Sequence, residues 1–104
     1  MVKYEIYQVK HGESKEIFLE FAFVDYEQIT KTHGEGAIKK ENYNLTYRME
    51  SAKELSLDDL FYIFNVNRPD DFNGRSLSVS DVVKTPDGYF FCDSFGWVKL
   101  DWED

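Results

Sequence analysis

The chain has 104 residues, of which 17% are aromatic, and twenty acidic against twelve basic side chains give a formal charge of −8. This length allows one hydrophobic core, the aromatic content excludes a disordered chain, and the acidity disfavours direct binding to nucleic-acid phosphates. The acid excess lies in residues 53–104, with eleven acids and five bases, whereas residues 1–52 hold nine acids and seven bases.

The same charge would attract a basic groove on another protein, although it is also an ordinary route to solubility. No run of about 18 apolar residues could span a bilayer, and the first residues lack the apolar core of a secretion signal, so we expect a cytoplasmic protein. Cys92 is the only cysteine, and we expect it to be buried and unreactive. His11 and His33 lack metal-binding spacing, so no metal or cofactor is expected.

In chain order, the first predicted element is a strand. Apolar and polar residues alternate over residues 2–7, which is typical of a strand with one buried face. Residues 11–14 have the composition of a turn. Apolar residues alternate again over residues 17–23, which predicts a second strand paired with the first as a hairpin.

The middle of the chain predicts a short helix and a strand. Asp25 is placed to cap a helix over residues 26–31, and Gly34 or Gly36 would end it. The next element has the clearest strand pattern in the chain. Its alternating apolar residues are Tyr43, Leu45, Tyr47 and Met49.

A second helix is predicted to begin at Ser56. The Ser56 hydroxyl can accept a free backbone amide hydrogen, while Asp58 and Asp59 lie in the first turn, where the helix dipole favours negative charge. Pro69 prevents the helix from continuing, and residues 70–74 form a polar loop with Asn-Gly at its tightest point. One apolar stripe is expected to pack on a sheet, formed by Leu57, Leu60, Phe61 and Phe64.

The last third of the chain predicts short strands joined by tight turns. Residues 77–83 and 89–93 would form strands around a hairpin turn at residues 85–88. Residues 94–96 would bend the chain into a last strand within residues 97–102. The whole pattern predicts one α+β domain over residues 1–104, an antiparallel sheet of about five or six strands with one or two packed helices.

Nothing in the chain has the pattern of a known catalytic site, and we expect a non-enzymatic protein. Ser76, Ser78 and Ser80 lack the Gly-x-Ser-x-Gly surroundings of a nucleophile, and we interpret them as outer strand or turn residues. Asp81 and Asp93 could approach each other across the predicted hairpin as an acid–base pair. A structural role is favoured, because so small a domain leaves little room for a substrate cleft.

The charged residues of the second half suggest a protein-binding surface. Arg75 either pairs with Asp70 or Asp71 and closes the loop, or contacts a partner. Three acidic groups could form one negative face, which would imitate DNA phosphates spaced about 3.4 Å apart along a strand. Helix capping and solubility explain the same residues more simply. These groups are Asp58 with Asp59, Asp70 with Asp71, and Asp101 with Glu103 and Asp104.

Several segments carry a resemblance to a known family. They are Tyr4-Glu5-Ile6-Tyr7-Gln8-Val9, Leu57-Asp58-Asp59-Leu60 with Phe64-Asn65, Arg68-Pro69-Asp70-Asp71-Phe72, Gly74-Arg75-Ser76-Leu77-Ser78-Val79-Ser80-Asp81-Val82-Val83, and Asp93-Ser94-Phe95-Gly96. Together they resemble the YodL-like domain, found in Gram-positive bacteria, their phages and their conjugative elements. The resemblance is strongest over residues 56–97 and less clear over residues 13–36. It implies an accessory protein of a mobile element, with no established catalytic residues to carry over.

Mobile elements also carry small acidic inhibitors of host defence, and the chain is similar in size and charge to many anti-CRISPR and anti-restriction proteins. We therefore expect an inhibitor that binds a defence nuclease in the host bacterial cytoplasm, above all a type II CRISPR RNA-guided endonuclease. The alternatives are a regulatory or adaptor module that binds a cytoskeletal or conjugation protein, and, third, a small hydrolase. Open strand edges allow a monomer or a weak dimer. The expected contacts are Asp58, Asp59, Asp70, Asp71 and Arg75, with Phe72 and Trp102 as exposed aromatic anchors.

Overall fold

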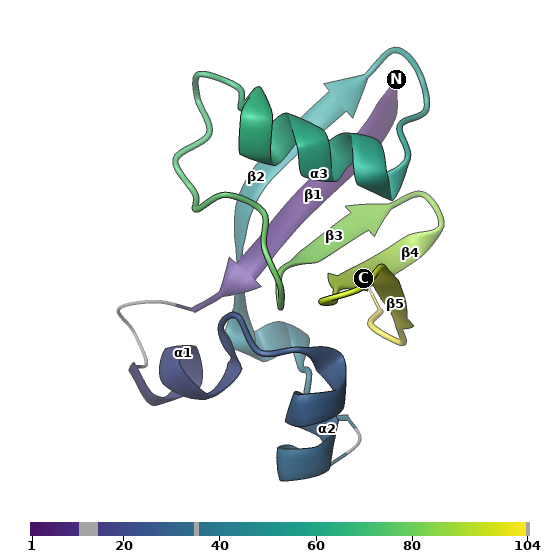
Figure 1. Ribbon diagram of the computed structural model, residues 1–104. Helices are drawn as coiled ribbons and strands as arrows, with labels where there is room; N and C mark the ends of the chain where they lie inside the picture. Colours follow the sequence, from purple (N-terminus) through teal and green to yellow (C-terminus); the bar gives the residue numbers. More distant parts are fainter. Residues whose placement is uncertain (11–14, 35, 104) are drawn as a thin grey trace.

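The computed structural model describes residues 1–10, 15–34 and 36–103 (Figure 1). In chain order the elements are β1 (Val2–Val9), α1 (Lys15–Phe21), α2 (Tyr26–His33), the 3-10 helix η1 (Lys40–Asn42), β2 (Tyr43–Ser51), α3 (Leu57–Val66), β3 (Val82–Thr85), β4 (Gly88–Cys92) and β5 (Trp97–Leu100). The predicted α+β domain is confirmed, with five strands, and with three α-helices in place of one or two. None of the helices described is a candidate for a membrane-spanning segment.

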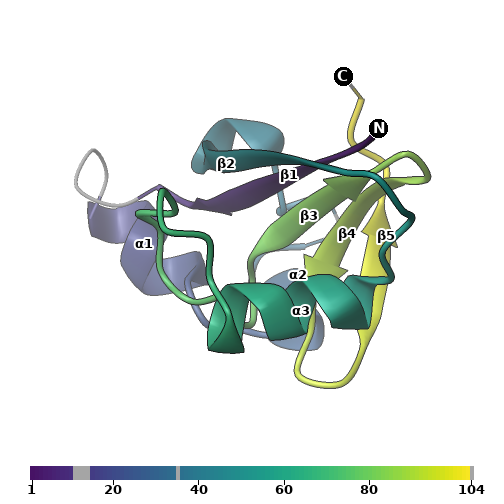
Figure 2. The same ribbon diagram turned by 90° about the horizontal axis from the view of Figure 1, so that it is seen from above.

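The five strands form one sheet in the order β2-β1-β3-β4-β5, and every neighbouring pair is antiparallel. β1 therefore lies inside the sheet, between β2 and β3. Seen together, Figures 1 and 2 show α3 crossing one side of the sheet and η1 on the opposite side. The helices α1 and α2 lie near each other beyond the end of β1.

The hydrophobic core is divided between the two faces of the sheet. Because neighbouring residues of a strand point to opposite faces, Tyr4 and Ile6 of β1 pack toward α3 while Tyr7 and Val9 pack on the other face. The buried residues on the α3 side are Tyr4, Ile6, Leu60, Phe64, Phe72, Leu77 and Val83. Those on the opposite side are Tyr7, Val9, Ala22, Ile29, Ile38, Tyr43, Val82, Tyr89 and Phe91.

The prediction that all the apolar residues of β2 share one face is wrong, because this strand contains a β-bulge. Tyr47 pairs with Ile6 but Leu45 pairs with Tyr7, so Thr46 is the extra residue on β2. Its hydroxyl donates a hydrogen bond to the Ile6 carbonyl oxygen at 3.1 Å. The extra residue reverses the alternation, so Tyr43 packs on the face away from α3 and Tyr47 on the face toward it.

The predicted second strand over residues 17–23 is wrong, because this segment forms α1 and the turn that follows it. β1 pairs with β2 and β3 instead. The segment is rich in apolar residues, which satisfy the helical period as well as the strand period. Phe18, Phe21 and Ala22 turn toward the core, while Leu19 and Phe23 are exposed. The turn predicted at residues 11–14 lies outside the described residues.

The helix predicted after Asp25 is confirmed as α2. The Asp25 carboxylate accepts a hydrogen bond from the Gln28 amide at 2.8 Å, which caps the helix start. Gly34 ends the helix with a φ of 93°, and its amide donates to the Thr30 carbonyl oxygen. The helix extends beyond the predicted residue 31 to His33, whose ring contacts Phe21.

The predicted strand over residues 77–83 is mostly wrong, because β3 begins only at Val82. Ser80 has a left-handed backbone with a φ of 84°, and the Asp81 amide donates to the Ser78 carbonyl oxygen, so the chain turns here. The hairpin turn between Thr85 and Gly88 is confirmed. The bend over residues 94–96 and the last strand, β5, are also confirmed.

Candidate functional site

The start of α3 is closed by a reciprocal pair of hydrogen bonds. Ser56 Oγ accepts from the Asp59 amide, and Asp59 Oδ2 accepts from the Ser56 amide, each at 3.0 Å. This is a capping box with Asp in place of the more common Glu or Gln. The hydrogen bonds from Ser56 lower the pKa of Asp59. Its carboxylate therefore has a structural role, whereas the exposed Asp58 accepts a long contact from Trp97 Nε1 at 3.4 Å.

The outer side of α3 carries exposed apolar side chains. Leu60 and Phe64 are fully buried, but Phe61, expected in the same stripe, is 41% exposed. Tyr62 and Val66 are 59% and 67% exposed. Since residues four apart share one side of a helix, Tyr62 and Val66 lie on the same side as Asp58. We call Phe61, Tyr62 and Val66 the α3 strip.

The loop after α3 holds the second acidic pair. Asp70 and Asp71 are exposed, and Asp71 Oδ1 accepts a hydrogen bond from the Tyr47 hydroxyl at 2.7 Å. This hydrogen bond raises the pKa of Tyr47. Asp58 and Asp70 lie near opposite ends of a helix of ten residues, about 15 Å long, so carboxylates stand beyond both ends of the α3 strip.

The prediction of Phe72 as an exposed anchor is wrong. Its ring is buried, and it packs edge-on against Phe64 and Tyr47 with ring centroids 5.0 and 5.5 Å apart. The Arg68 guanidinium lies 5.9 Å from the centre of the Phe72 ring and donates to the Gly74 carbonyl oxygen. Phe72 was predicted to be exposed because the loop around it is polar, but its ring packs into the core beneath that loop.

Arg75 has a different partner from the predicted Asp70 or Asp71. Its guanidinium lies beside the rings of Phe18 and Phe23, 5.1 and 5.6 Å from their centres, and Nη2 is 4.0 Å from Asp81 Oδ1. The structure describes no contact of Arg75 with Asp70 or Asp71, the pairing that we considered. The Arg75 side chain is one-third exposed. It contacts Phe18 of α1 as well as the buried Asp81 carboxylate.

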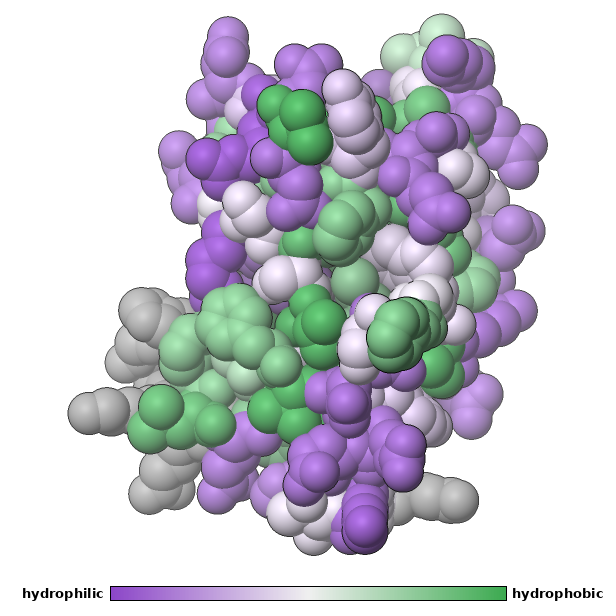
Figure 3. Space-filling model, viewed as in Figure 1, coloured by the Kyte–Doolittle hydropathy of each residue, from purple (hydrophilic) through white to green (hydrophobic). Residues whose placement is uncertain are grey.

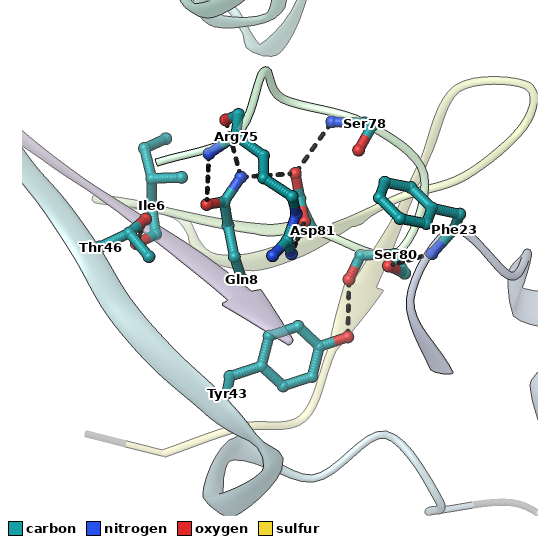
Figure 4. Close-up of polar contacts among 9 residues, drawn as sticks. All are labelled: Ile6, Gln8, Phe23, Tyr43, Thr46, Arg75, Ser78, Ser80 and Asp81. Carbon is teal, nitrogen blue, oxygen red and sulfur yellow. Dashed lines mark hydrogen bonds and ion pairs between the residues drawn. The ribbon is translucent and has the colours of Figure 1, made fainter. Parts of the chain in front are cut away.

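That carboxylate belongs to a buried polar cluster of Gln8, Arg75, Ser78 and Asp81 (Figure 4). Asp81 is 1% exposed, and its Oδ2 accepts hydrogen bonds from Gln8 Nε2 and from the Ser78 amide. Gln8 also donates to the Arg75 carbonyl oxygen and accepts from the Arg75 amide. Burial raises the pKa of Asp81 to about 7.

The cluster is structural in its geometry, because the hydrogen bonds of Gln8 link residues 67 to 73 positions apart and Asp81 is fully buried. Asp93 has other partners, since its Oδ1 accepts from the amides of Tyr26 and Ser94. The proposed Asp81–Asp93 acid–base pair therefore gains no support. Gln8, a polar residue at an inward position of β1, is the signal that could have indicated the cluster.

Trp102 is half-buried and is also not a free anchor. Its ring packs against Tyr7, Tyr43 and Tyr89, with centroids 5.1 to 6.0 Å apart, and Nε1 donates to the Ile38 carbonyl oxygen at 2.8 Å. This packing lies on the sheet face away from α3, the side on which the chain end lies in Figure 2. Asp101 and Glu103 flank Trp102, and the Glu103 carbonyl oxygen accepts a hydrogen bond from Lys40 beside Tyr7, so these two acids do not share a face with those around α3. Asp104 and His11 lie outside the described residues.

Exposed apolar side chains also gather over α1, at the lower left of Figure 3, above a strongly hydrophilic region over α2. Leu19 and Phe23 are the large exposed members. Cys92 is buried as expected, and burial raises the pKa of its thiol to about 12. Among residues 1–10, 15–34 and 36–103, no group of three His, Cys, Asp or Glu side chains could hold a metal ion.

Comparison with known proteins agrees with the resemblance in the sequence. No curated protein and no solved structure matches the chain significantly. The profile of the YodL-like domain matches residues 3–102, which span every strand and helix described above except the first residue of β1. The chain therefore belongs to the YodL-like domain family.

Proposed function

We propose that this protein is a non-enzymatic mobile-element protein that binds and inhibits a host defence nuclease, with a type II CRISPR RNA-guided endonuclease as the first target. The binding surface in this proposal is the α3 strip together with Asp58, Asp70 and Asp71. Asp59, Phe72 and Trp102 are left out of it, because the helix cap and the core hold them.

The observation that carries the proposal is the α3 strip itself. A helix that packs Leu60 and Phe64 into the core would ordinarily turn polar residues outward, yet this one exposes Phe61, Tyr62 and Val66. Aromatic side chains are enriched among the residues that dominate protein interfaces. Exposed apolar side chains are also visible among hydrophilic ones over α3 in Figure 3.

The charges around the strip favour a basic partner. Carboxylates lie beyond both ends of the strip, and the chain as a whole has a formal charge of −8. A nuclease that holds nucleic acid in a positively charged channel presents the complementary surface, and the opposite charges would speed association. The mobile-element setting implied by the family resemblance is where such inhibitors are expected.

The test is DNA cleavage by a panel of type II RNA-guided nucleases, with the protein added before guide RNA, after guide RNA or after DNA. Size-exclusion chromatography of each mixture would detect a complex. We expect at least one nuclease to be slowed and to co-elute with the protein. The order of addition that abolishes the effect identifies the blocked step.

Two charge-reversed double variants distinguish an effect of the acids beside α3 from an effect of the net charge of the chain. Asp58→Lys with Asp70→Lys should abolish inhibition, whereas Asp101→Lys with Glu103→Lys changes the net charge equally on the other side of the sheet and should retain it. Tyr62→Ala should weaken inhibition without changing the charge. Equal loss in both double variants would contradict a role for the α3 surface.

An adaptor that binds a cytoskeletal or conjugation protein is the second candidate, favoured by the exposed Leu19 and Phe23 on the other apolar region. Binding through that region would be largely insensitive to charge reversal beside α3. It would be lost with Leu19→Ser, which removes an exposed apolar contact. Failure of every nuclease in the panel, with no co-elution, would reject the inhibitor proposal for those targets.

A further inference from the structure

Among the described residues, the outer edge of β2 is a long strand edge with no partner strand in the sheet. β2 has nine residues and lies at one end of the strand order, whereas β5 at the other end has only four. An unpaired edge presents free backbone N–H and C=O groups and is a template for another strand. The β2 sequence Tyr-Asn-Leu-Thr-Tyr-Arg-Met-Glu-Ser contains no proline, a residue that commonly protects such edges, and its bulge at Thr46 lies outside the segment from Arg48 to Glu50.

The charges on β2 have a self-complementary spacing. Arg48 and Glu50 are two residues apart, so they share one face of the strand, the face away from α3. Arg48 is 74% exposed. In an antiparallel pair of two β2 strands centred on Met49, Arg48 of each copy lies opposite Glu50 of the other.

This register also extends an alternation of charge that already crosses the sheet. Within one chain, Lys84 lies opposite Glu5 and Glu5 opposite Arg48, with Arg48 Nε 3.0 Å from Glu5 Oε2. Glu50 lies opposite Lys3. Across the interface the row would continue from Lys84, Glu5 and Arg48 to Glu50 and Lys3 of the second copy. Each step joins opposite signs.

We propose that β2 pairs with β2 of a second copy of this chain, in the antiparallel register centred on Met49, to form a dimer with one continuous sheet. The interface has two-fold symmetry, so each Arg48–Glu50 pair occurs twice. Moving the centre of the pairing by one residue in either direction, which shifts the paired residues by two, places Arg48 opposite Arg48 or Glu50 opposite Glu50, and cross-strand like charges are unfavourable. The register centred on Tyr47 pairs neither charge.

A second copy fits this edge better than the basic partner proposed for α3. Lys3 and Arg48 balance Glu5 and Glu50 around it, while the acid excess of the chain is larger in residues 53–104. A strongly basic protein would gain little attraction from a balanced row of charges. The dimer interface also leaves the α3 strip as a separate surface.

Sedimentation equilibrium over a range of concentrations tests the proposal. We expect the mass to rise with concentration from 12.3 kDa to twice that value. Arg48→Glu alone and Glu50→Arg alone should each raise the dimer dissociation constant at least about tenfold, since two attractive pairs become repulsive. An equimolar mixture of the two variants should restore the dimer, because their charges complement each other.

The mixture is the decisive measurement. Arg48→Glu also breaks the pair with Glu5, so circular dichroism must first show that each variant folds; mixing changes nothing within either chain. Glu27→Arg, an exposed reversal on α2, is the control and should dimerise like the parent chain. A parent chain that stays at 12.3 kDa throughout, or a mixture no more dimeric than either variant alone, would overturn the proposal. Neither result bears on nuclease inhibition, which is measured separately.

Discussion

The backbone amide of Phe23 donates a hydrogen bond to the side-chain oxygen of Ser80 at 2.9 Å, and both residues have left-handed backbone conformations, with φ of 66° and 84°. They are the only non-glycine residues with positive φ in the described part of the chain. Each such residue costs on the order of 1 kcal/mol or more. The bond joins the end of the α1 turn to the turn before β3, so each strained turn supports the other.

Substitutions at Ser80 should distinguish the free-energy cost of the strained backbone from the stabilisation that the hydrogen bond provides. Ser80→Ala keeps the strained backbone and leaves the Phe23 amide without its acceptor, so we expect a loss of about 2 kcal/mol in the free energy of unfolding. Ser80→Gly loses the same acceptor but relieves the strain, and it should cost about 1 kcal/mol less. Urea unfolding measures both. A glycine variant less stable than the alanine variant would contradict this account.

The buried Asp81 should make the protein less stable as the pH rises. Its pKa in the folded protein is raised to about 7, against about 3.9 in an unfolded chain, so the folded state binds more protons between these values. The free energy of unfolding should therefore fall as the pH rises toward 7. Glu5 and Asp59 have lowered pKa values and contribute in the opposite sense only at more acidic pH.

The measurement is urea unfolding at several pH values between about 5 and 8, where ordinary carboxylates stay ionised. Asp81→Asn should show a flatter pH dependence than the parent chain. Asp101→Asn, an exposed substitution, should keep the parent slope. A parent chain whose stability rises over this interval would contradict the raised pKa.

Two glycines should respond to alanine for different reasons. At Gly74 an added Cβ would lie 2.6 Å from Gln8 Oε1 and 2.8 Å from the Phe72 ring, so Gly74→Ala should cost on the order of 2–3 kcal/mol through overpacking. At Gly34 nothing lies within 4 Å, but φ is 93°, so Gly34→Ala should cost only about 1 kcal/mol of backbone strain. Thermal or urea unfolding of the two variants gives the comparison. Equal losses would contradict the close approach at Gly74.

Two large aromatic residues, Trp102 and Phe95, should differ in how much their substitution destabilises the protein. Trp102→Ala removes a ring packed against three tyrosines and should destabilise the protein by about 3 kcal/mol. Phe95, at the β4–β5 bend, is 95% exposed, and Phe95→Ser should change stability by less than about 0.5 kcal/mol. Urea unfolding checks both. A neutral Trp102→Ala would indicate an exposed side chain and would contradict the packing described here.

The candidate binding residues were less predictable than the fold. The sequence pointed to the acidic pairs around α3, but exposure could not be read from it, so Phe72 was assigned to the surface and Phe61 to the core. A single apolar residue in a loop lacks the repeating apolar spacing that shows which residues of a helix or strand point toward the core. Arg75 was predicted to pair with Asp70 or Asp71, which are close to it in the sequence. Its partner is Asp81, which is buried and accepts a hydrogen bond from Gln8.

The sequence by itself determined the features that depend on residues a few positions apart. These are the caps at Asp25 and Ser56, the turn between Thr85 and Gly88, and the strand periods of β1, β4 and β5. Only the tertiary structure decided between helix and strand for residues 17–23, whose apolar residues fit both periods. It also decided the bulge at Thr46, the strand order and the cluster that joins Gln8 to Asp81 across 73 positions. These depend on contacts between distant segments, and a local pattern does not specify which segments meet.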